Sequence, residues 1–158
     1  MRLILVIMAG VFYKNVPDFE LFLIGFTIFC LDGLDGYLAR KFKQVSEFGA
    51  YLDMETDALY VGIFTVILYE KGLAGYWILI TGFMRYFYGT IIILTGRKSQ
   101  DKIRTKFGPL VAGIFFVSIL SPLVLSSAFY MPVLMISSSL ILLSFAYSFI
   151  QNLGIISG

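Results

Sequence analysis

Long apolar stretches separated by short polar breaks dominate the chain, and they run on without the period-two alternation of half-buried strands. A bilayer core of about 30 Å needs about 20 helical residues to be crossed. Five stretches come close to this length and are expected to form membrane-spanning helices: 19–40, 47–69, 73–95, 107–126 and 129–150.

A sixth apolar run, Leu3 to Tyr13, precedes these five. It would give a helix of only about 17 Å at a rise of about 1.5 Å per residue, which is too short to cross the bilayer unaided. We interpret it as a short or truncated first helix. The predicted fold is therefore all-α: a polytopic membrane bundle of about six transmembrane helices, forming one domain over 1–158.

Composition and charge support a membrane protein. Hydrophobic residues make up 59% of the chain and charged residues 14%, which is far outside the range of soluble domains. Because Lys and Arg are retained on the cytoplasmic side, the basic residues also predict the orientation. With the start inside, nine face the cytoplasm and two, Lys14 and Lys71, face out; the nine are Arg2, Arg40, Lys41, Lys43, Arg97, Lys98, Lys102, Arg104 and Lys106.

The net charge of +2 is thus explained by topology and by attraction to anionic lipid heads or phosphorylated substrates. Nucleic-acid binding is not expected. The predicted location is a multi-pass position in a membrane, with a bacterial inner membrane as the expected one and with membrane lipids as surrounding partners.

Four aspartates lie inside or at the edge of two predicted spans: Asp32, Asp35, Asp53 and Asp57. Carboxylates there are costly and usually mark function. Spacings of three and four residues put each pair on one helical face. Counted from the cytoplasmic ends, Asp32 and Asp57 lie roughly 12 to 15 Å deep, so we expect the two pairs to meet at similar depth.

Such a cluster needs a cation. Oxygen ligands, in a chain with no histidine, favour Mg²⁺ or Mn²⁺ over zinc or copper, and two such ions can bridge a diphosphate. Gly36 and Gly49 each lie four residues from an aspartate of the set, which leaves room for a ligand. Ala39 continues this small surface, and Arg40 offers a fork of donors to a phosphate.

The combined pattern resembles the signature of the CDP-alcohol phosphatidyltransferase family. It reads D-x2-D-G-x2-A-R-x8-G-x3-D-x3-D without a gap or substitution, and its eight specified positions are Asp32, Asp35, Gly36, Ala39, Arg40, Gly49, Asp53 and Asp57. The resemblance implies a six-helix membrane fold, usually a homodimer, with the active site open to the cytoplasm.

The resemblance also implies an activity in phospholipid biosynthesis. A phosphatidyl or other substituted phosphate group would pass from a CDP-activated lipid, such as CDP-diacylglycerol, to an alcohol acceptor, with release of CMP. By the same resemblance Asp32, Asp35 and Asp53 are metal ligands, and Asp57 is the general base and a further ligand. The CDP-binding positions implied are Gly36, Ala39, Arg40 and Gly49.

Three basic residues outside the motif are candidates for acceptor binding. Arg85 lies about ten residues from the cytoplasmic end of its span, at the depth of Asp57, and so needs a partner. The partner is either Glu55 or another acid, in a structural ion pair, or a phosphate of the acceptor. Arg104 and Lys106 precede the next span and either only set topology or reach into the cytoplasmic mouth. Glu55 itself points away from the aspartate face, so we do not count it as a ligand.

The acceptor is left open among glycerol 3-phosphate, inositol phosphate, serine and other alcohols. Ala58 follows the last aspartate, where members resembling phosphatidylglycerophosphate synthases tend to have Lys. Family members also usually carry more sequence before the first span, in line with a truncated first helix.

Two rival functions remain at this point. An intramembrane prenyltransferase also binds Mg²⁺-diphosphate through aspartates on two helices, but generally has more spans and more widely separated motifs. A cation transporter would use the aspartates as a transport site, but it would leave the register of Gly36, Ala39, Arg40 and Gly49 unexplained.

Overall fold

The computed structural model describes residues 2–42, 47–94 and 107–152, and this part of the chain contains helices and turns but no strand. The elements, in chain order, are α1 (Arg2–Phe12), η1 (Tyr13–Asn15), α2 (Asp18–Lys41), α3 (Glu47–Glu70), α4 (Trp77–Leu94), α5 (Phe107–Ser118), η2 (Ser121–Leu123) and α6 (Ser127–Asn152), where η marks a 3₁₀ helix. The expected all-α bundle is confirmed.

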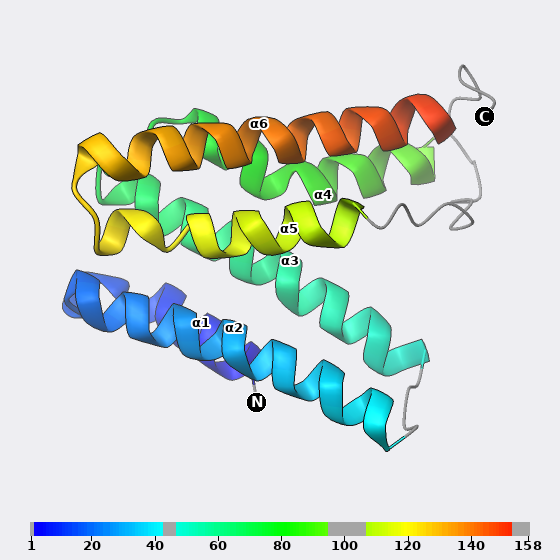
Figure 1. The fold of residues 1–158 in the computed structure, drawn as a ribbon, viewed down its shortest axis with the longest axis horizontal. Helices are drawn as coiled ribbons and strands as arrows, with labels where there is room; N and C mark the ends of the chain where they lie inside the picture. Colours follow the sequence, from blue (N-terminus) through cyan, green and yellow to red (C-terminus); the bar gives the residue numbers. More distant parts are fainter. Residues whose placement is uncertain (1, 43–46, 95–106, 153–158) are drawn as a thin grey trace.

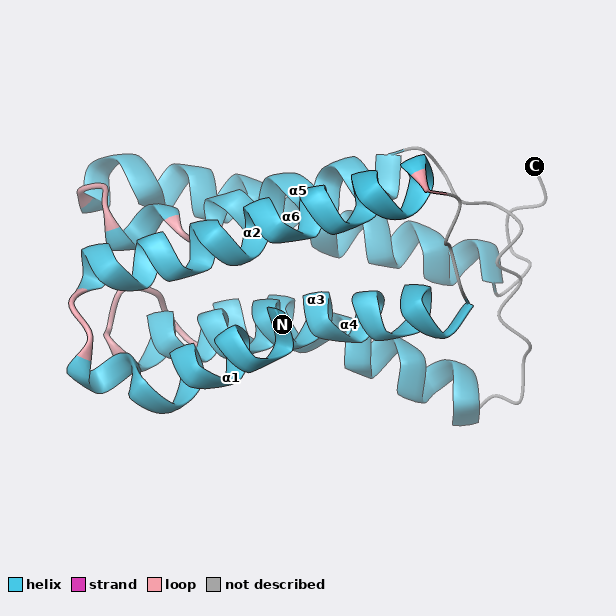
Figure 2. Cartoon of the chain, turned by 90° about the horizontal axis from the view of Figure 1, so that it is seen from below, coloured by secondary structure: helices cyan, strands magenta, loops and turns pink. Residues whose placement is uncertain are grey.

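The helices run alternately back and forth along one long axis (Figure 1). The turns after α1, α3 and α5 lie together at one end of the bundle, which we call the turn end. At the other end, which we call the site end, α2, α4 and α6 finish and α3 and α5 begin. Seen along a perpendicular direction, α2, α5 and α6 form one layer, and α1, α3 and α4 form the other (Figure 2).

The predicted spans 19–40, 47–69 and 129–150 agree with α2, α3 and α6 to within two residues at each end. The span predicted from 73 begins later, at Trp77, because α3 ends in a Schellman turn. In that turn Gly72 has φ 68°, and the amide of Leu73 donates to the carbonyl of Leu68 at 2.9 Å. A left-handed φ of this kind favours glycine.

The span predicted over 107–126 is interrupted. Helix α5 ends at Ser118 and is followed by η2, in which Pro122 lacks the amide that would continue an α-helix. Helix α6 then packs back along α5, and the hydroxyls of Ser118 and Ser137 form a hydrogen bond of 2.7 Å between the two helices.

Within the described residues, Ser127–Ile150 is the one helical stretch long and apolar enough to cross a membrane by composition, with a mean hydropathy of 2.0. A shorter apolar stretch covers Leu110–Leu123. The aspartates on α2 and α3 lower the hydropathy of those helices, which is the expected cost of placing acids inside a span.

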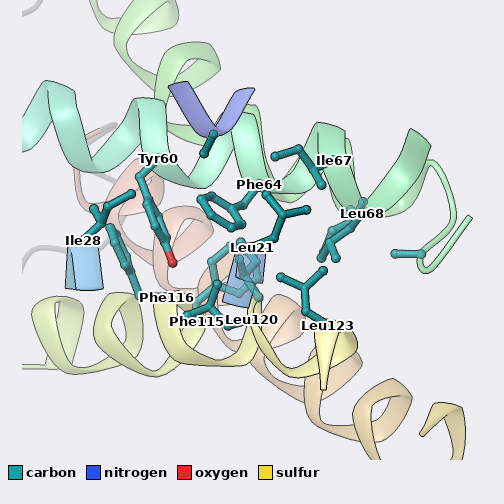
Figure 3. Packing of buried hydrophobic residues seen from close by; sticks show 14 of the residues in the cluster. Leu21, Ile28, Tyr60, Phe64, Ile67, Leu68, Phe115, Phe116, Leu120 and Leu123 are labelled. Atoms are coloured by element: carbon teal, nitrogen blue, oxygen red, sulfur yellow. The ribbon is translucent and has the colours of Figure 1, made fainter. Parts of the chain in front are cut away.

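The hydrophobic core fills the turn end and the middle of the bundle (Figure 3). On α2 it uses Leu21 and Ile28, and these face aromatic and aliphatic side chains of α3, α5 and η2. The ring of Tyr60 stacks on Phe116 with centroids 4.3 Å apart and also packs on Phe64 at 4.5 Å. Ile28, Tyr60 and Phe116 form the edge of the core toward the site end.

Candidate active site

The aspartates continue the inward faces of α2 and α3 just beyond this core edge. Asp32 follows the buried Ile28 by four residues, and Asp57 precedes the buried Tyr60 by three, so each lies on the same helical face as a core residue. Asp32, Asp53 and Asp57 each contribute one carboxylate oxygen to a group in which all atoms lie within 4.8 Å of one another. The predicted meeting of the two helices' carboxylates is confirmed for these three.

Asp35 lies at the margin of this group. Its side chain is 63% exposed, against 32% for Asp32. Its spacing from Asp32 puts it on the same side of α2 but one turn closer to the site end. The three other aspartates therefore form the centre of the candidate site, and Asp35 lies beside its opening.

Arg2, at the start of α1, reaches into the carboxylate group. Its guanidinium is in close contact with Asp32 and Asp53, and it lies 3.5 Å from both Asp35 Oδ2 and Asp57 Oδ1. The side chain is only 10% exposed. One basic side chain thus connects α1 to all four aspartates of the motif.

Sequence reasoning assigned Arg2 to topology alone and missed this position. The helical spacing of Arg2, Val6 and Ala9 did indicate a buried position for Arg2. The three residues share one face of α1, and the last two are buried in the core. That face packs between α2 and α3. The sequence could not show which residues of α2 and α3 the first turn of α1 would meet.

The donor set fits a divalent metal ion. Mg²⁺ and Mn²⁺ take oxygen ligands, and in phosphoryl-transfer sites they commonly use a few carboxylates while keeping positions open for substrate phosphates and water. The three central carboxylates converge from two helices, and they remain partly exposed. The guanidinium of Arg2 among them shows that the geometry accommodates positive charge.

A cavity of about 320 Å³ opens beside Asp57, between α3, α4, α5 and α6. Most of its lining is apolar. Its polar lining residues are Asp57, Thr81, Arg85, Ser144 and Ser148. Thr81 and the two serines were not predicted as site residues, since single hydroxyl side chains on an apolar helix give no local signal in a sequence.

Arg85 forms an ion pair with Glu55, with Nη2 to Oε1 at 2.8 Å. The contact between Arg85 and Glu55 that the sequence predicts is therefore present; a role of Arg85 toward an acceptor phosphate stays a prediction. Arg85 also lines the cavity that contains Asp57. Glu55 points to α4 rather than to the carboxylate group, as expected from its place on α3.

The other motif positions lie toward the site end. Gly36, Ala39 and Arg40 are in the last turns of α2, where the structure describes the backbone but not the side chains. Gly49 is exposed in the first turn of α3. Arg104 and Lys106 lie outside the described residues.

Comparison with known protein families gives a match over nearly the whole chain. A model of the family described as CDP-alcohol phosphatidyltransferase matches residues 1–150. The chain belongs to this family. The resemblance drawn from the aspartate signature is thereby confirmed, and the rival interpretations as prenyltransferase or cation transporter lose their basis. Membership also supports a membrane-embedded protein.

Individual relatives agree with the family. The CDP-diacylglycerol–inositol 3-phosphatidyltransferase 1 of Arabidopsis thaliana is 45% identical over 69 residues, which are 43% of this chain and 30% of the relative. The CDP-diacylglycerol–inositol 3-phosphatidyltransferase of Candida albicans is 30% identical over 145 residues, 84% of this chain and 60% of the relative. A CDP-diacylglycerol–glycerol-3-phosphate 3-phosphatidyltransferase of Bacillus subtilis is 38% identical over 78 residues, 48% of this chain and 39% of the relative.

The matched regions therefore span less than two thirds of the length of these relatives. The relatives come from a plant, a yeast and a bacterium, so the similarity does not single out the bacterial inner membrane expected from the sequence.

Proposed function

We propose that this protein transfers a phosphatidyl group from CDP-diacylglycerol to the hydroxyl of a polar alcohol and releases CMP. The observation that carries the proposal is the convergence of Asp32, Asp53 and Asp57 beside a cavity that Asp57 shares with Arg85. The names of the relatives supply the donor, since each contains CDP-diacylglycerol.

The four motif aspartates, Asp32, Asp35, Asp53 and Asp57, would hold two divalent ions, Mg²⁺ or Mn²⁺. When bound, such ions neutralise the donor diphosphate and the charge that develops on the departing CMP. The carboxylates would fix where these ions lie, and through them the diphosphate, because they come from two helices that are packed through the same core.

Asp57 is the proposed general base. It belongs to the carboxylate group and also lines the cavity, so a hydroxyl bound there lies next to a proton acceptor. The acceptor oxygen forms a bond to the lipid-linked phosphorus, its proton passes to Asp57, and the bond from phosphorus to the CMP oxygen breaks.

The nucleotide would lie against the last turns of α2 and the first turn of α3. The small residues Gly36, Ala39 and Gly49 allow close approach, and Arg40 offers several N–H donors to a phosphate. This side of the site would open to the cytoplasm, as the distribution of basic residues predicts, in a protein that spans the membrane as a homodimer.

The acceptor would enter the cavity beside Asp57. Inositol and glycerol 3-phosphate are the acceptors that the relatives' names provide, and inositol phosphate and serine complete the set to be tested. A phosphorylated acceptor would use Arg85, with Arg104 and Lys106 as further contacts. The Ala58 that follows Asp57 argues against glycerol 3-phosphate.

The proposal is tested by following CMP release from CDP-diacylglycerol in liposomes containing the purified chain. Each acceptor is added in turn with Mg²⁺, with Mn²⁺ and with a chelator. We expect one acceptor to give stoichiometric CMP and phospholipid, only when metal is present. Absence of CMP with every acceptor would overturn the proposal. Diphosphate release from a prenyl diphosphate, or metal uptake without turnover of CDP-lipid, would revive one of the rivals.

A further inference from the structure

Arg2 supplies a positive charge at the place where the proposed metal ions would bind. Its guanidinium contacts Asp32 and Asp53 closely and lies 3.5 Å from Asp35 and Asp57. We propose that Arg2 is a built-in counter-ion of the carboxylate group: it holds the aspartates together without metal, and metal binding has to displace it.

The central carboxylates repel one another. Asp32, Asp53 and Asp57 bring oxygens within 4.8 Å of one another. Carboxylates this close repel one another, and they do so more strongly where surrounding helices lower the dielectric constant. A guanidinium presents several N–H donors in a planar fork, so a single side chain can bridge acids from two helices.

Arg2 and a divalent ion would compete for the same carboxylate oxygens. The contacts of Arg2 use Oδ1 of Asp32, Asp53 and Asp57. A divalent ion bound by these oxygens would lie next to the guanidinium, and the two positive charges would repel. The side chain therefore has to move away when the ion binds. The free energy needed to move it lowers the metal affinity of the wild-type protein.

Core packing of α1 positions Arg2. Val6 and Ala9 anchor the same face of α1 in the core. Gly10 lies against α3 so closely that a Cβ there would be 3.0 Å from Ile63. The helix is therefore fixed, and displacement requires rotation of the Arg2 side chain rather than movement of α1.

The test compares metal binding by wild type and Arg2→Gln, with Mn²⁺ alone and no substrate. Free Mn²⁺ is measured by electron paramagnetic resonance, and thermal unfolding is followed with and without Mn²⁺. We expect Arg2→Gln to bind Mn²⁺ about tenfold more tightly, because no cationic side chain then has to be displaced; a tenfold change corresponds to about 1.4 kcal/mol. The variant should unfold at a lower temperature than wild type without metal, and the difference should shrink at saturating Mn²⁺.

The inference rests on the metal site of the proposed function, and the outcomes separate the two. If neither protein binds Mn²⁺, the metal site itself fails. If both bind it with equal affinity, or the variant binds it more weakly, the role of Arg2 fails while the metal site stands.

Two further variants serve as controls, one for the loss of an ion pair elsewhere and one for the charge of Arg2. Lys71→Gln removes an ion pair at the turn end, and it should leave Mn²⁺ affinity unchanged and shift unfolding equally with and without metal. Arg2→Lys keeps the charge but loses the fork, so its Mn²⁺ affinity should lie between wild type and Arg2→Gln. Should Arg2→Gln fail to fold, an Arg2→Lys affinity equal to or weaker than wild type would overturn the proposal.

Discussion

The two halves of α2 differ sharply in what surrounds them. Toward the turn end, Leu21, Gly25 and Ile28 are buried at the three- and four-residue spacing of one packed face. Beyond Ile28, the side chains that the structure describes on α2 are partly or fully exposed, and they include Asp32 and Asp35. A single helix thus uses one half for packing and the other for chemistry, so stability and activity should be separable by position.

The ion pairs show the same contrast. At the turn end, Lys71 pairs with Asp18 at 2.6 Å, and the carboxylate is about half exposed. In the middle of the bundle, Arg2 is nearly enclosed and contacts four acids. Exposed pairs contribute little because water screens them, whereas an enclosed charge strongly affects whatever binds its partners.

The largest effect is expected at Asp57. Asp57→Asn removes the proposed base and a carboxylate of the metal group, so CMP release should fall by about 10³-fold or more, while binding of CDP-lipid is largely kept. The initial rate of CMP release and CDP-lipid binding measure the two effects. Asp18→Asn at the turn end is the matched control and should keep the wild-type rate. Strong residual activity in Asp57→Asn would remove the residue from the base role.

The next largest effect is expected on the free energy of unfolding, at one of two glycines of α2. A Cβ at Gly25 would lie 2.5 Å from Leu120 and 2.9 Å from Phe64, whereas a Cβ at Gly33 would meet nothing within 4 Å. Gly25→Ala should therefore destabilise the fold by about 1–3 kcal/mol through overpacking.

Gly33→Ala is the control and should leave stability unchanged or slightly raised, because alanine is the better helix former. Thermal unfolding in detergent measures both. Equal losses in the two variants would show that the site half of α2 is packed as tightly as the turn half.

A smaller effect is expected at Arg85. Arg85→Gln should raise the KM for a phosphorylated acceptor about tenfold, the value of one charge-assisted hydrogen bond, and change the KM for CDP-lipid less. Glu55→Gln removes the same ion pair but keeps the arginine, so it is the matched control. If both variants raise the KM values for acceptor and donor alike, Arg85 serves only the ion pair.

The smallest effect is expected at Lys71. Lys71→Gln should lower the free energy of unfolding by less than about 1 kcal/mol, because the pair with Asp18 is partly exposed. CMP release should be unchanged. A clear loss of activity would mean that the turn end is coupled to the site, contrary to the separation along α2.

The sequence was sufficient to predict the limits of α2, α3 and α6 and the helical faces that carry the aspartates, because both depend on spacing within one element. The span limits of α2 and α3 follow from apolar length, and the shared faces of the aspartate pairs follow from helical period. The break between α5 and η2 was missed although Ser121 and Pro122 form a readable helix-ending pair, because the apolar length of the run was given more weight.

What could not be predicted depends on how separate helices align. Arg2 lies 30 residues from Asp32 in the chain, and only the register of α1 against α2 and α3 brings them together. The same is true of Ser144 and Ser148, which reach the cavity because α6 packs beside α4. Such alignments arise from core packing over many residues, so a local sequence pattern does not predict them.

The interruption after Ser118 has a consequence for biosynthesis. The described part of α5 has 12 residues, or about 18 Å of helix, and its apolar stretch with η2, Leu110–Leu123, is shorter than a bilayer core of about 30 Å requires. Helix α6, in contrast, has a stretch that is long and apolar enough to cross. The hydrogen bond between Ser118 and Ser137 and the packing of the two helices join them as a hairpin. We therefore expect the insertion machinery to release α5 into lipid only together with α6, as one unit.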